Sequence, residues 1–207
     1  FPAYVNSLGL KDENGDPLTL DADGEGSLKE YVKRVVMESA QRASDQGVDL
    51  SDKPWLIVEN GKVQGMDFTA YVKDITRMKT APAFDALDLE SPENDLFGNE
   101  TTNCRHFTEY STAHTKSTGR VCGKQKFVKN DESNGIHYGR KKQKKAQHFR
   151  IRHGECDRDT SLVISAMLTA KLREAGCEVD YHSPWNTPHA GDYDLDELFA
   201  WIDGICG

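Results

Sequence analysis

The chain of 207 residues contains no long apolar run, no CxxC motif and no initiating methionine. No apolar stretch approaches the ~20 residues that a membrane-spanning helix needs, so an integral membrane protein is not expected. No secretory leader is visible either, but the chain begins with Phe1, and the compartment is therefore left open. Such a beginning suggests a fragment or a processed piece of a longer protein.

Cysteine is scarce as well, with five residues at irregular spacing. An odd number without a CxxC pair argues against a disulfide framework or a zinc ribbon, so we expect mostly free thiols. A zinc site built from Cys104, His106 and His114 would lack a second well-spaced ligand pair. The sequence therefore predicts no zinc.

One acidic cluster resembles the start of a calcium-binding loop, with Asp192, Asp194 and Asp196 in alternation. Glu197, however, occupies the position where that loop requires glycine. Carboxylates are also favoured beside a helix N-terminus without any ion. We therefore expect neither a metal nor a cofactor.

The net charge of −8 is spread unevenly along the chain. Residues 1–100 carry −10, residues 101–145 carry +8, and residues 146–207 carry −6. The basic run 140–145 would be the footprint of a non-catalytic module that binds nucleic acid or an anionic surface. Since the rest of the chain is acidic and no aromatic residues interleave the run, nucleic acid is not the expected partner. Residues 111–145 are expected to be an irregular solvated segment, with disorder as one option.

Apolar spacing and turn residues predict an alternation of helices and strands elsewhere. In the last third the order is strand, helix, strand, helix, which predicts parallel strands joined by a crossover. A Ser27–Glu30 capping box is expected to open the first helix, and Asp159 or Thr160 is expected to cap the third. The expected elements are helices over 27–46, 67–78, 160–175 and 194–205, a hairpin over 55–64, and strands over 147–152 and 178–182. Residues 79–110 are expected to be loop. The last helix is expected to be buried through Leu195, Leu198, Phe199 and Ile202.

Two polar residues follow the strands of this last third. Asp157 ends the motif His153-Gly154-Glu155-Cys156-Asp157, and His189 ends Pro184-Trp185-Asn186-Thr187-Pro188-His189. The carboxyl ends of parallel strands meet at one edge of a sheet, so both side chains should lie there. A carboxylate beside an imidazole fixes its tautomer and stabilises its charged form. The non-catalytic alternatives are that the histidine is a surface residue and that the aspartate caps a helix.

The nucleophile that would complete such a triad is missing. In α/β hydrolases the chain order is Ser, then Asp or Glu, then His, with the serine in G-x-S-x-G. Only near misses occur, around Ser7, Ser117 and Ser133, each with a glycine on one side only. The serine is therefore expected upstream of this chain, and the chain alone should lack full activity.

Longer runs of sequence resemble the C-terminal part of bacterial tannase-like serine esterases (the subtype B tannases). The resemblance implies an α/β fold: the C-terminal portion of an α/β-hydrolase sheet with a mainly helical lid insertion. It implies a lid over 1–110 and a catalytic core over 146–207, and shows no family pattern over 111–145. The runs that carry it are Ile75–Asp85, Ser91–Asn94, Phe149–Gly154, Asp157–Ser161, Pro184-Trp185, His189, Gly191–Asp194 and Leu198–Ile202.

Residue roles follow from the resemblance. It implies that Asp157 is the triad acid and His189 the base, and that Lys79, Glu93 and Asp159 contact the hydroxyl groups of a galloyl ester. Trp185, four residues before His189, either walls the acyl pocket or packs in the core. The expected partners are a small-molecule ester substrate and the missing N-terminal half of the same hydrolase.

Overall fold

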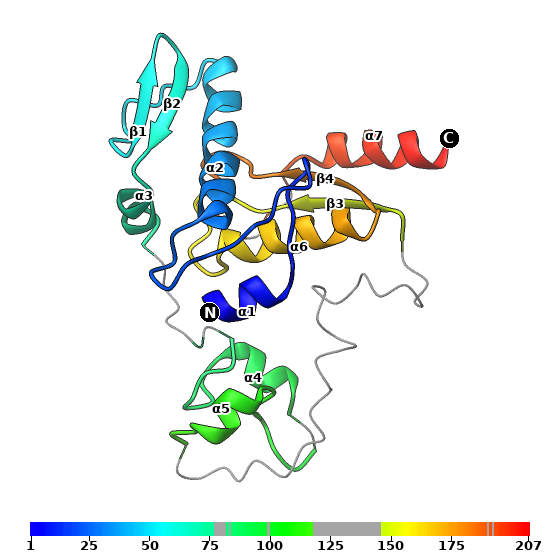
Figure 1. The fold of residues 1–207 in the computed structure, drawn as a ribbon. Coiled ribbons are helices and arrows are strands. Elements are labelled where there is room, and N and C mark those ends of the chain that lie inside the picture. The colour runs from blue at the N-terminus through cyan, green and yellow to red at the C-terminus, as the bar shows by residue number, and fades with distance from the viewer. Residues whose placement is uncertain (77–81, 83, 99, 118–145, 190, 192) are drawn as a thin grey trace. The chain divides into compact units, whose positions relative to one another are not determined.

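The computed structural model describes residues 1–76, 82, 84–98, 100–117, 146–189, 191 and 193–207. The chain forms two compact units, which Figure 1 shows as a ribbon. The first unit combines Phe1–Arg77 with Tyr138–Gly207, and the second spans Met78–His137. The first unit thus joins segments that are far apart in the sequence, and it contains all the strands of the described residues.

Helix α2 (Ser27–Asp45) follows a short helix α1 (Pro2–Ser7) and lies close to its predicted bounds. It packs against α6 (Leu162–Glu174) and the strand β2 (Lys62–Met66), so its apolar side is buried. Burying one Val or Leu side chain fully contributes about 1.5–3 kcal/mol, so such a face holds the unit together. The buried residues of α2 are Leu28, Tyr31, Val32, Val35, Val36, Ser39, Ala40 and Ala43.

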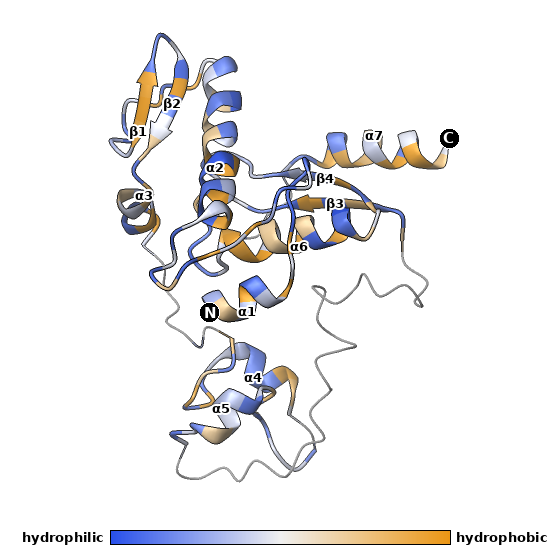
Figure 2. Cartoon of the chain, viewed as in Figure 1, coloured by the Kyte–Doolittle hydropathy of each residue, from blue (hydrophilic) through white to orange (hydrophobic). Residues whose placement is uncertain are grey.

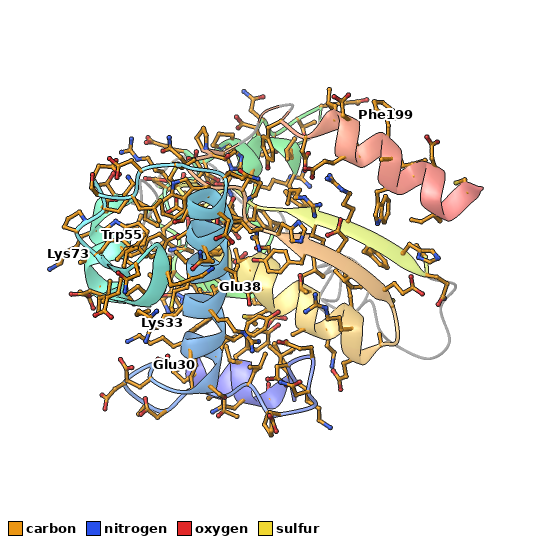
Figure 3. The ribbon with its side chains drawn as sticks, turned by 90° about the horizontal axis from the view of Figure 1, so that it is seen from above. Glu30, Lys33, Glu38, Trp55, Lys73 and Phe199 are labelled. Atoms are coloured by element: carbon orange, nitrogen blue, oxygen red, sulfur yellow. The ribbon has the colours of Figure 1, made fainter. Side chains whose placement is uncertain are left out.

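The predicted capping box at the start of α2 is wrong. Gly26 is the N-cap residue, and no side chain caps the helix. The Ser27 hydroxyl accepts from the Thr19 amide and donates to the Pro17 carbonyl, while Glu30 pairs with Lys33 on the outside of α2 (Figure 3). Contacts with the preceding loop therefore outcompeted the local cap.

A small hairpin follows, as predicted. β1 (Leu56–Glu59) and β2 (Lys62–Met66) pair antiparallel. Asn60 and Gly61 have φ values of 50° and 74°, which is the left-handed pair that a tight type I′ turn requires. Asp67 then caps α3 (Phe68–Asp74), accepting from the Ala70 amide, and α3 is shorter than the predicted helix over 67–78.

The last third has the predicted order. β3 (His148–Arg152) and β4 (Glu178–His182) are parallel neighbours, and α6 connects them and packs on β4. The α/β prediction is therefore confirmed at this level. The cap of α6 differs from expectation, because Ser161 is the N-cap residue and makes no side-chain cap bond.

Helix α7 (Leu195–Cys206) forms where it was predicted, but its predicted burial is wrong. None of its described residues is buried. Leu195 is 45% exposed, Phe199 60% and Ile202 37%. Figure 2 shows the apolar character of this helix, and Figure 3 shows Phe199 on the side of α7 turned away from α6. The spacing of these residues predicted a helix correctly but could not show what covers it.

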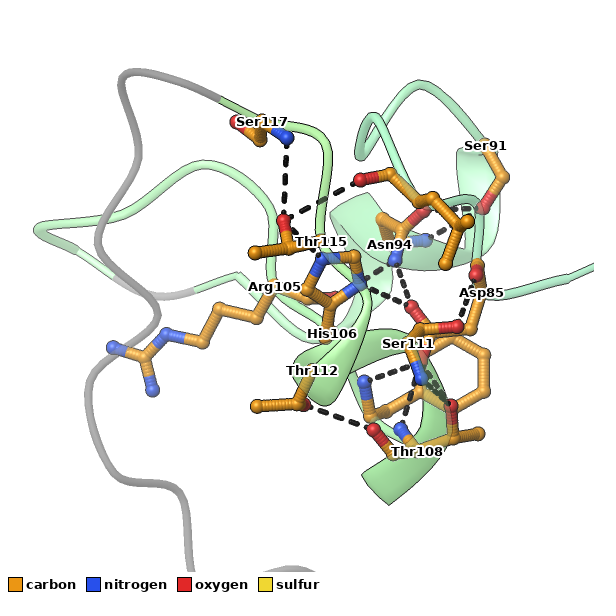
Figure 4. A network of polar contacts seen from close by, with 12 residues as sticks. Asp85, Ser91, Asn94, Arg105, His106, Thr108, Ser111, Thr112, Thr115 and Ser117 are labelled. Atoms are coloured by element: carbon orange, nitrogen blue, oxygen red, sulfur yellow. Dashed lines mark hydrogen bonds and ion pairs between the residues drawn. The ribbon is translucent and has the colours of Figure 1, made fainter. Parts of the chain in front are cut away.

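The second unit is organised around one buried carboxylate (Figure 4). Its described residues contain two short helices, α4 (Pro92–Leu96) and α5 (Glu109–Ala113), where the sequence predicted only loop over 79–110. Asp85, 2% exposed, accepts from the Asn94 side chain, the Phe107 and Thr108 amides and the Thr108 hydroxyl, and contacts His106 Nδ1 at 2.7 Å. Polar contacts thus replace much of an apolar core.

The remaining sequence predictions concern the cysteines, a zinc site, membrane spans and the basic run. Cys104, Cys156, Cys177 and Cys206 are free thiols. His106 Nε2 contacts the Thr115 hydroxyl at 2.9 Å, so both ring nitrogens have protein partners. Within the part of the chain that the structure describes, no helix is long and apolar enough to cross a membrane. Residues 118–145, with the basic run 140–145, lie outside the described residues.

Candidate active site

Two loops meet at the carboxyl ends of the parallel strands. The Asp loop (153–161) follows β3 and the His loop (183–193) follows β4. Glu155 donates its amide to the Pro184 carbonyl at 3.0 Å, and Cys156 donates to Thr187 at 3.2 Å. A Cβ at Gly154 would overlap the carbonyl oxygens of Thr187 and Pro188, so glycine is required for this close approach. The loops therefore form one hydrogen-bonded assembly.

The assembly brings Asp157 and His189 together. His189 Nδ1 lies 3.0 Å from Asp157 Oδ2. The two side chains differ in exposure: that of Asp157 is 6% exposed and that of His189 is 52% exposed. A buried carboxylate thus contacts a half-exposed imidazole, which is the geometry of an acid–base pair.

Asp157 is further held by its own loop. Its Oδ1 accepts from the amides of Asp159 at 2.8 Å and Thr160 at 2.9 Å, and its Oδ2 lies 3.4 Å from His153 Nε2. Burial alone would raise the pKa of Asp157, but the hydrogen bonds from Thr160, His189 and Asp159 together outweigh it and lower that pKa. The carboxylate therefore stays ionised at neutral pH.

Asp159 lies beside this pair. Asp157, Asp159 and His189 each present one ligand atom within 4.8 Å of the others, so the three side chains could also surround a cation. Exposed acidic groups often lie this close without one. The role expected of Asp159 as a helix cap is wrong, because Ser161 takes that position.

Trp185 packs into an aromatic cluster. Its ring lies 5.9 Å from that of Trp55, which in turn lies 5.0 Å from Tyr71 in an edge-to-face arrangement. Trp55 also donates its indole N–H to Asp74 at 2.8 Å. The half-buried Trp185 thereby fastens the His loop to the hairpin and to α3.

The resemblance also implies substrate contacts for Glu93 and Lys79. Glu93 is in the first turn of α4, in the second unit, next to the buried Asn94. Lys79 lies outside the described residues. The structure therefore brings Asp157, Asp159 and His189 together, and describes Glu93 within its own unit.

Sequence reasoning missed the buried Glu155, which lies two residues before Asp157. Burial raises the pKa of Glu155 to about 7, against the hydrogen bond from the Asn186 amide and the charge of Lys53. Its Oε2 accepts that amide at 3.3 Å. The only signal in the sequence was a glutamate inside the His-Gly-x-x-Asp motif, which by itself says nothing about burial.

A cavity of about 340 Å³ lies beside Asp157 in the first unit. Its volume is within the range of small-molecule sites, and its walls are largely apolar. The residues from α2, α3 and α6 that line it include Leu28, Val32, Phe68, Tyr71, Val72, Leu162 and Val163.

Comparison with solved structures gives a consistent match. The chain superposes on the tannase from Lactobacillus plantarum with a TM-score of 0.88 and 40% identity, over all of this chain and 44% of that chain. A tannin acyl hydrolase in complex with ethyl gallate gives a TM-score of 0.88 and 40% identity, over 100% and 45% of the two chains. The Fusobacterium nucleatum tannase gives 0.86 and 38%, over 100% and 44%.

Two other comparisons are negative. No family model matches the chain. No curated protein matches it either. The chain spans less than half the length of the solved tannases that it matches. Over its whole length, nevertheless, it is a tannase-like chain in both fold and sequence.

Proposed function

We propose that the full-length protein is a carboxylic ester hydrolase of the tannase type, in which Asp157 is the triad acid and His189 the base. The observation that carries the proposal is the 3.0 Å contact between His189 Nδ1 and the buried, ionised Asp157. The match to tannases at 38–40% identity supports the same chemistry.

The chemistry is acyl transfer. A serine hydroxyl attacks the ester carbonyl while His189 Nε2 takes its proton, and the imidazolium then gives that proton to the leaving alcohol. Water then attacks the acyl-enzyme while His189 takes its proton, and the imidazolium returns that proton to the serine as the acid is released. Asp157 keeps Nδ1–H directed toward its carboxylate and stabilises the imidazolium that forms twice in each cycle.

The serine belongs, in this proposal, to a part of the protein outside residues 1–207. No G-x-S-x-G motif occurs in the chain, and the matched tannases are more than twice as long. The donors that stabilise the oxyanion would come mostly from the same missing part. The chain would thus supply half of an active site, with residues 146–207 as a piece of the hydrolase core and 1–110 as its lid.

A phenolic acyl group is the proposed substrate feature. One matched structure is a tannin acyl hydrolase in complex with ethyl gallate. In the present chain, Asp159 and Glu93 offer carboxylates that accept hydrogen bonds from phenolic hydroxyls, and Lys79 offers a donor. The position of Asp159 beside Asp157 and His189 supports a contact with a substrate near the reacting ester.

Covalent labelling of the full-length protein tests where the nucleophile lies. A fluorophosphonate should modify one serine outside residues 1–207, as mapped by peptide mass spectrometry, because only an activated serine reacts rapidly. His189→Ala should abolish the labelling. His148→Ala, which changes a partly exposed histidine paired with Glu178, should leave it intact. Labelling of a serine within 1–207, or labelling that survives in His189→Ala, would contradict the proposal.

A further inference from the structure

Glu155 is a buried carboxylate placed between the two catalytic loops. It is 2% exposed and belongs to the Asp loop, yet its Oε2 accepts from the amide of Asn186 in the His loop at 3.3 Å. Asn186 is three residues before His189. Burying a carboxylate costs free energy, and the mechanism above gives Glu155 no role that would offset this cost.

The main chain of Asn186 needs such an anchor. Its φ of 50° places a non-glycine residue in the left-handed region, which costs free energy unless surrounding contacts fix it. Trp185 on one side packs against Trp55, and Thr187 on the other accepts from the Cys156 amide. The carboxylate of Glu155 holds the residue between these two.

Hydrogen bonds from α2 and α3 hold the main chain of the two loops around Glu155. The Tyr71 hydroxyl of α3 donates to the Glu155 carbonyl at 2.7 Å. The Ser39 hydroxyl of α2 donates to the carbonyl of Ser183, where the His loop begins. Both loops are thus tied to the rest of the first unit, and the bond from Asn186 to Glu155 ties them to each other next to the base.

From these contacts, and resting on the proposed function, we propose that Glu155 is a positioning residue. Its carboxylate holds the His loop against the Asp loop so that His189 Nδ1 stays directed at Asp157. Glu155 contacts neither the reacting atoms nor the imidazole itself, and acts through the main chain of Asn186.

The strength of this anchor depends on pH. An ionised carboxylate accepts a stronger hydrogen bond from an amide than a neutral carboxyl group does, but at Glu155 the cost of burying the charge exceeds the gain from this bond. Burial raises the pKa of Glu155 to about 7 in the folded loops, so ionisation favours opening and the anchor weakens as the pH rises through neutrality. The titratable and charged groups that act on it are Lys53 and Asp52 before β1, Asp74 and Tyr71 in α3, and the neighbouring Cys156 in the Asp loop.

Hydrogen exchange in the full-length protein measures the anchor directly. In a peptide spanning 184–188 only three amides exchange, those of Trp185, Asn186 and Thr187, because the other two residues are prolines. After correction for intrinsic rates, protection in the wild type should fall roughly tenfold between pH 6 and pH 8, because the open loops bind fewer protons than the closed loops. Glu155→Gln, which keeps an acceptor without charge, should remove that dependence, and Glu155→Ala should lose protection at both pH values.

Kinetics give the second measurement. With methyl gallate as substrate, Glu155→Ala should lower kcat by roughly tenfold to a hundredfold with little change in KM, because the base is misplaced while substrate contacts remain. Glu155→Gln should restore most of kcat. Glu178→Gln, an exposed glutamate on β4, is the matched control and should behave as wild type.

The two measurements distinguish failure of the proposed function from failure of the role of Glu155. If the full-length protein hydrolyses no ester, the proposed function is wrong, and the exchange data still test the anchor. If it hydrolyses methyl gallate but Glu155→Ala keeps wild-type exchange over 184–188 and wild-type kcat, the role of Glu155 is refuted. The same holds if Glu155→Gln keeps the pH dependence of the wild type.

Discussion

At the scale of single residues, the site rests on two buried carboxylates with opposite pKa shifts. Hydrogen bonds to Asp157 outweigh its burial and lower its pKa, whereas burial dominates at Glu155 and raises its pKa to about 7. Asp157 accepts from two amides and contacts two imidazoles, and Glu155 accepts from one amide. The number of donors around each group therefore decides which effect prevails.

The raised pKa of Glu155 predicts a pH-dependent stability. Its folded pKa lies above the unfolded value of 4.5, so the group costs nothing at pH 4, where both states are protonated. As the pH rises from 4.5 to about 7, only the unfolded state ionises, and the folded state loses on the order of 3 kcal/mol. Relative to Glu155→Gln, the wild type should lose this much stability between pH 4.5 and pH 8.

Urea unfolding of the full-length protein at several pH values measures that difference, with Glu178→Gln as the control whose difference from wild type stays constant. A constant difference for Glu155→Gln over the same range would show that Glu155 is not desolvated as described. The sequence could not reveal this group, because nothing in His-Gly-Glu-Cys-Asp states which of its side chains faces inward.

At the scale of elements, the sequence predicted correctly those features that depend only on neighbouring residues. Asn60-Gly61 forms the predicted hairpin because its turn needs two positive φ values that these residues tolerate. The start of α2 was decided by contacts outside the helix instead, because Ser27 bonds to a loop eight residues and more upstream. At α6, Ser161 is the N-cap residue and makes no side-chain cap bond. Sequence spacing carries no information about such distant partners.

At this scale, the role of the buried Asp85 in the second unit can be tested. Asp85→Ala should remove the acceptor shared by Asn94, Phe107 and Thr108 and leave their buried donors unpaired, at about 1–3 kcal/mol for each. Since α4 and α5 are too short to be stable alone, the described part of this unit should unfold locally. Hydrogen exchange over 84–117 should then become fast, while peptides of α2 and α6 keep their protection.

Glu90→Gln, an exposed residue of the same segment, should leave exchange over 84–117 unchanged. Slow exchange there in Asp85→Ala would show that the apolar contacts of the unit suffice without the carboxylate. Asp85 was matched to the family in sequence only as the end of the run 75–85, and its central position could be learned only from the structure.

At the scale of the whole molecule, the chain resembles one part of a larger enzyme. It matches less than half of each solved tannase, and the apolar residues of α7 remain exposed. The amphipathic spacing of Leu195, Phe199 and Ile202 predicted a buried face, because periodicity reports which side of a helix is apolar. What covers that side is decided by chain segments that spacing within the helix does not describe.

The contact between Asp157 and His189 was predictable at this scale for a different reason. Asp157 and His189 are 32 residues apart, but both follow parallel strands whose carboxyl ends meet at one edge. The order of strands and loops alone therefore predicts that the two side chains lie close together. The positions of Glu93 and Lys79 relative to this pair follow from no such rule, and their proposed roles rest on the resemblance alone.

The most direct test of the account is hydrolysis of methyl gallate by the full-length protein. We predict turnover that falls by about 10⁴-fold in kcat for His189→Ala and for Asp157→Asn, because each removes the base or its correct tautomer. His148→Ala, the matched histidine control on β3, should retain wild-type kcat, and residues 1–207 alone should show no turnover. A wild type that leaves methyl gallate intact, or a His189→Ala variant that keeps its kcat within about tenfold, would contradict the account.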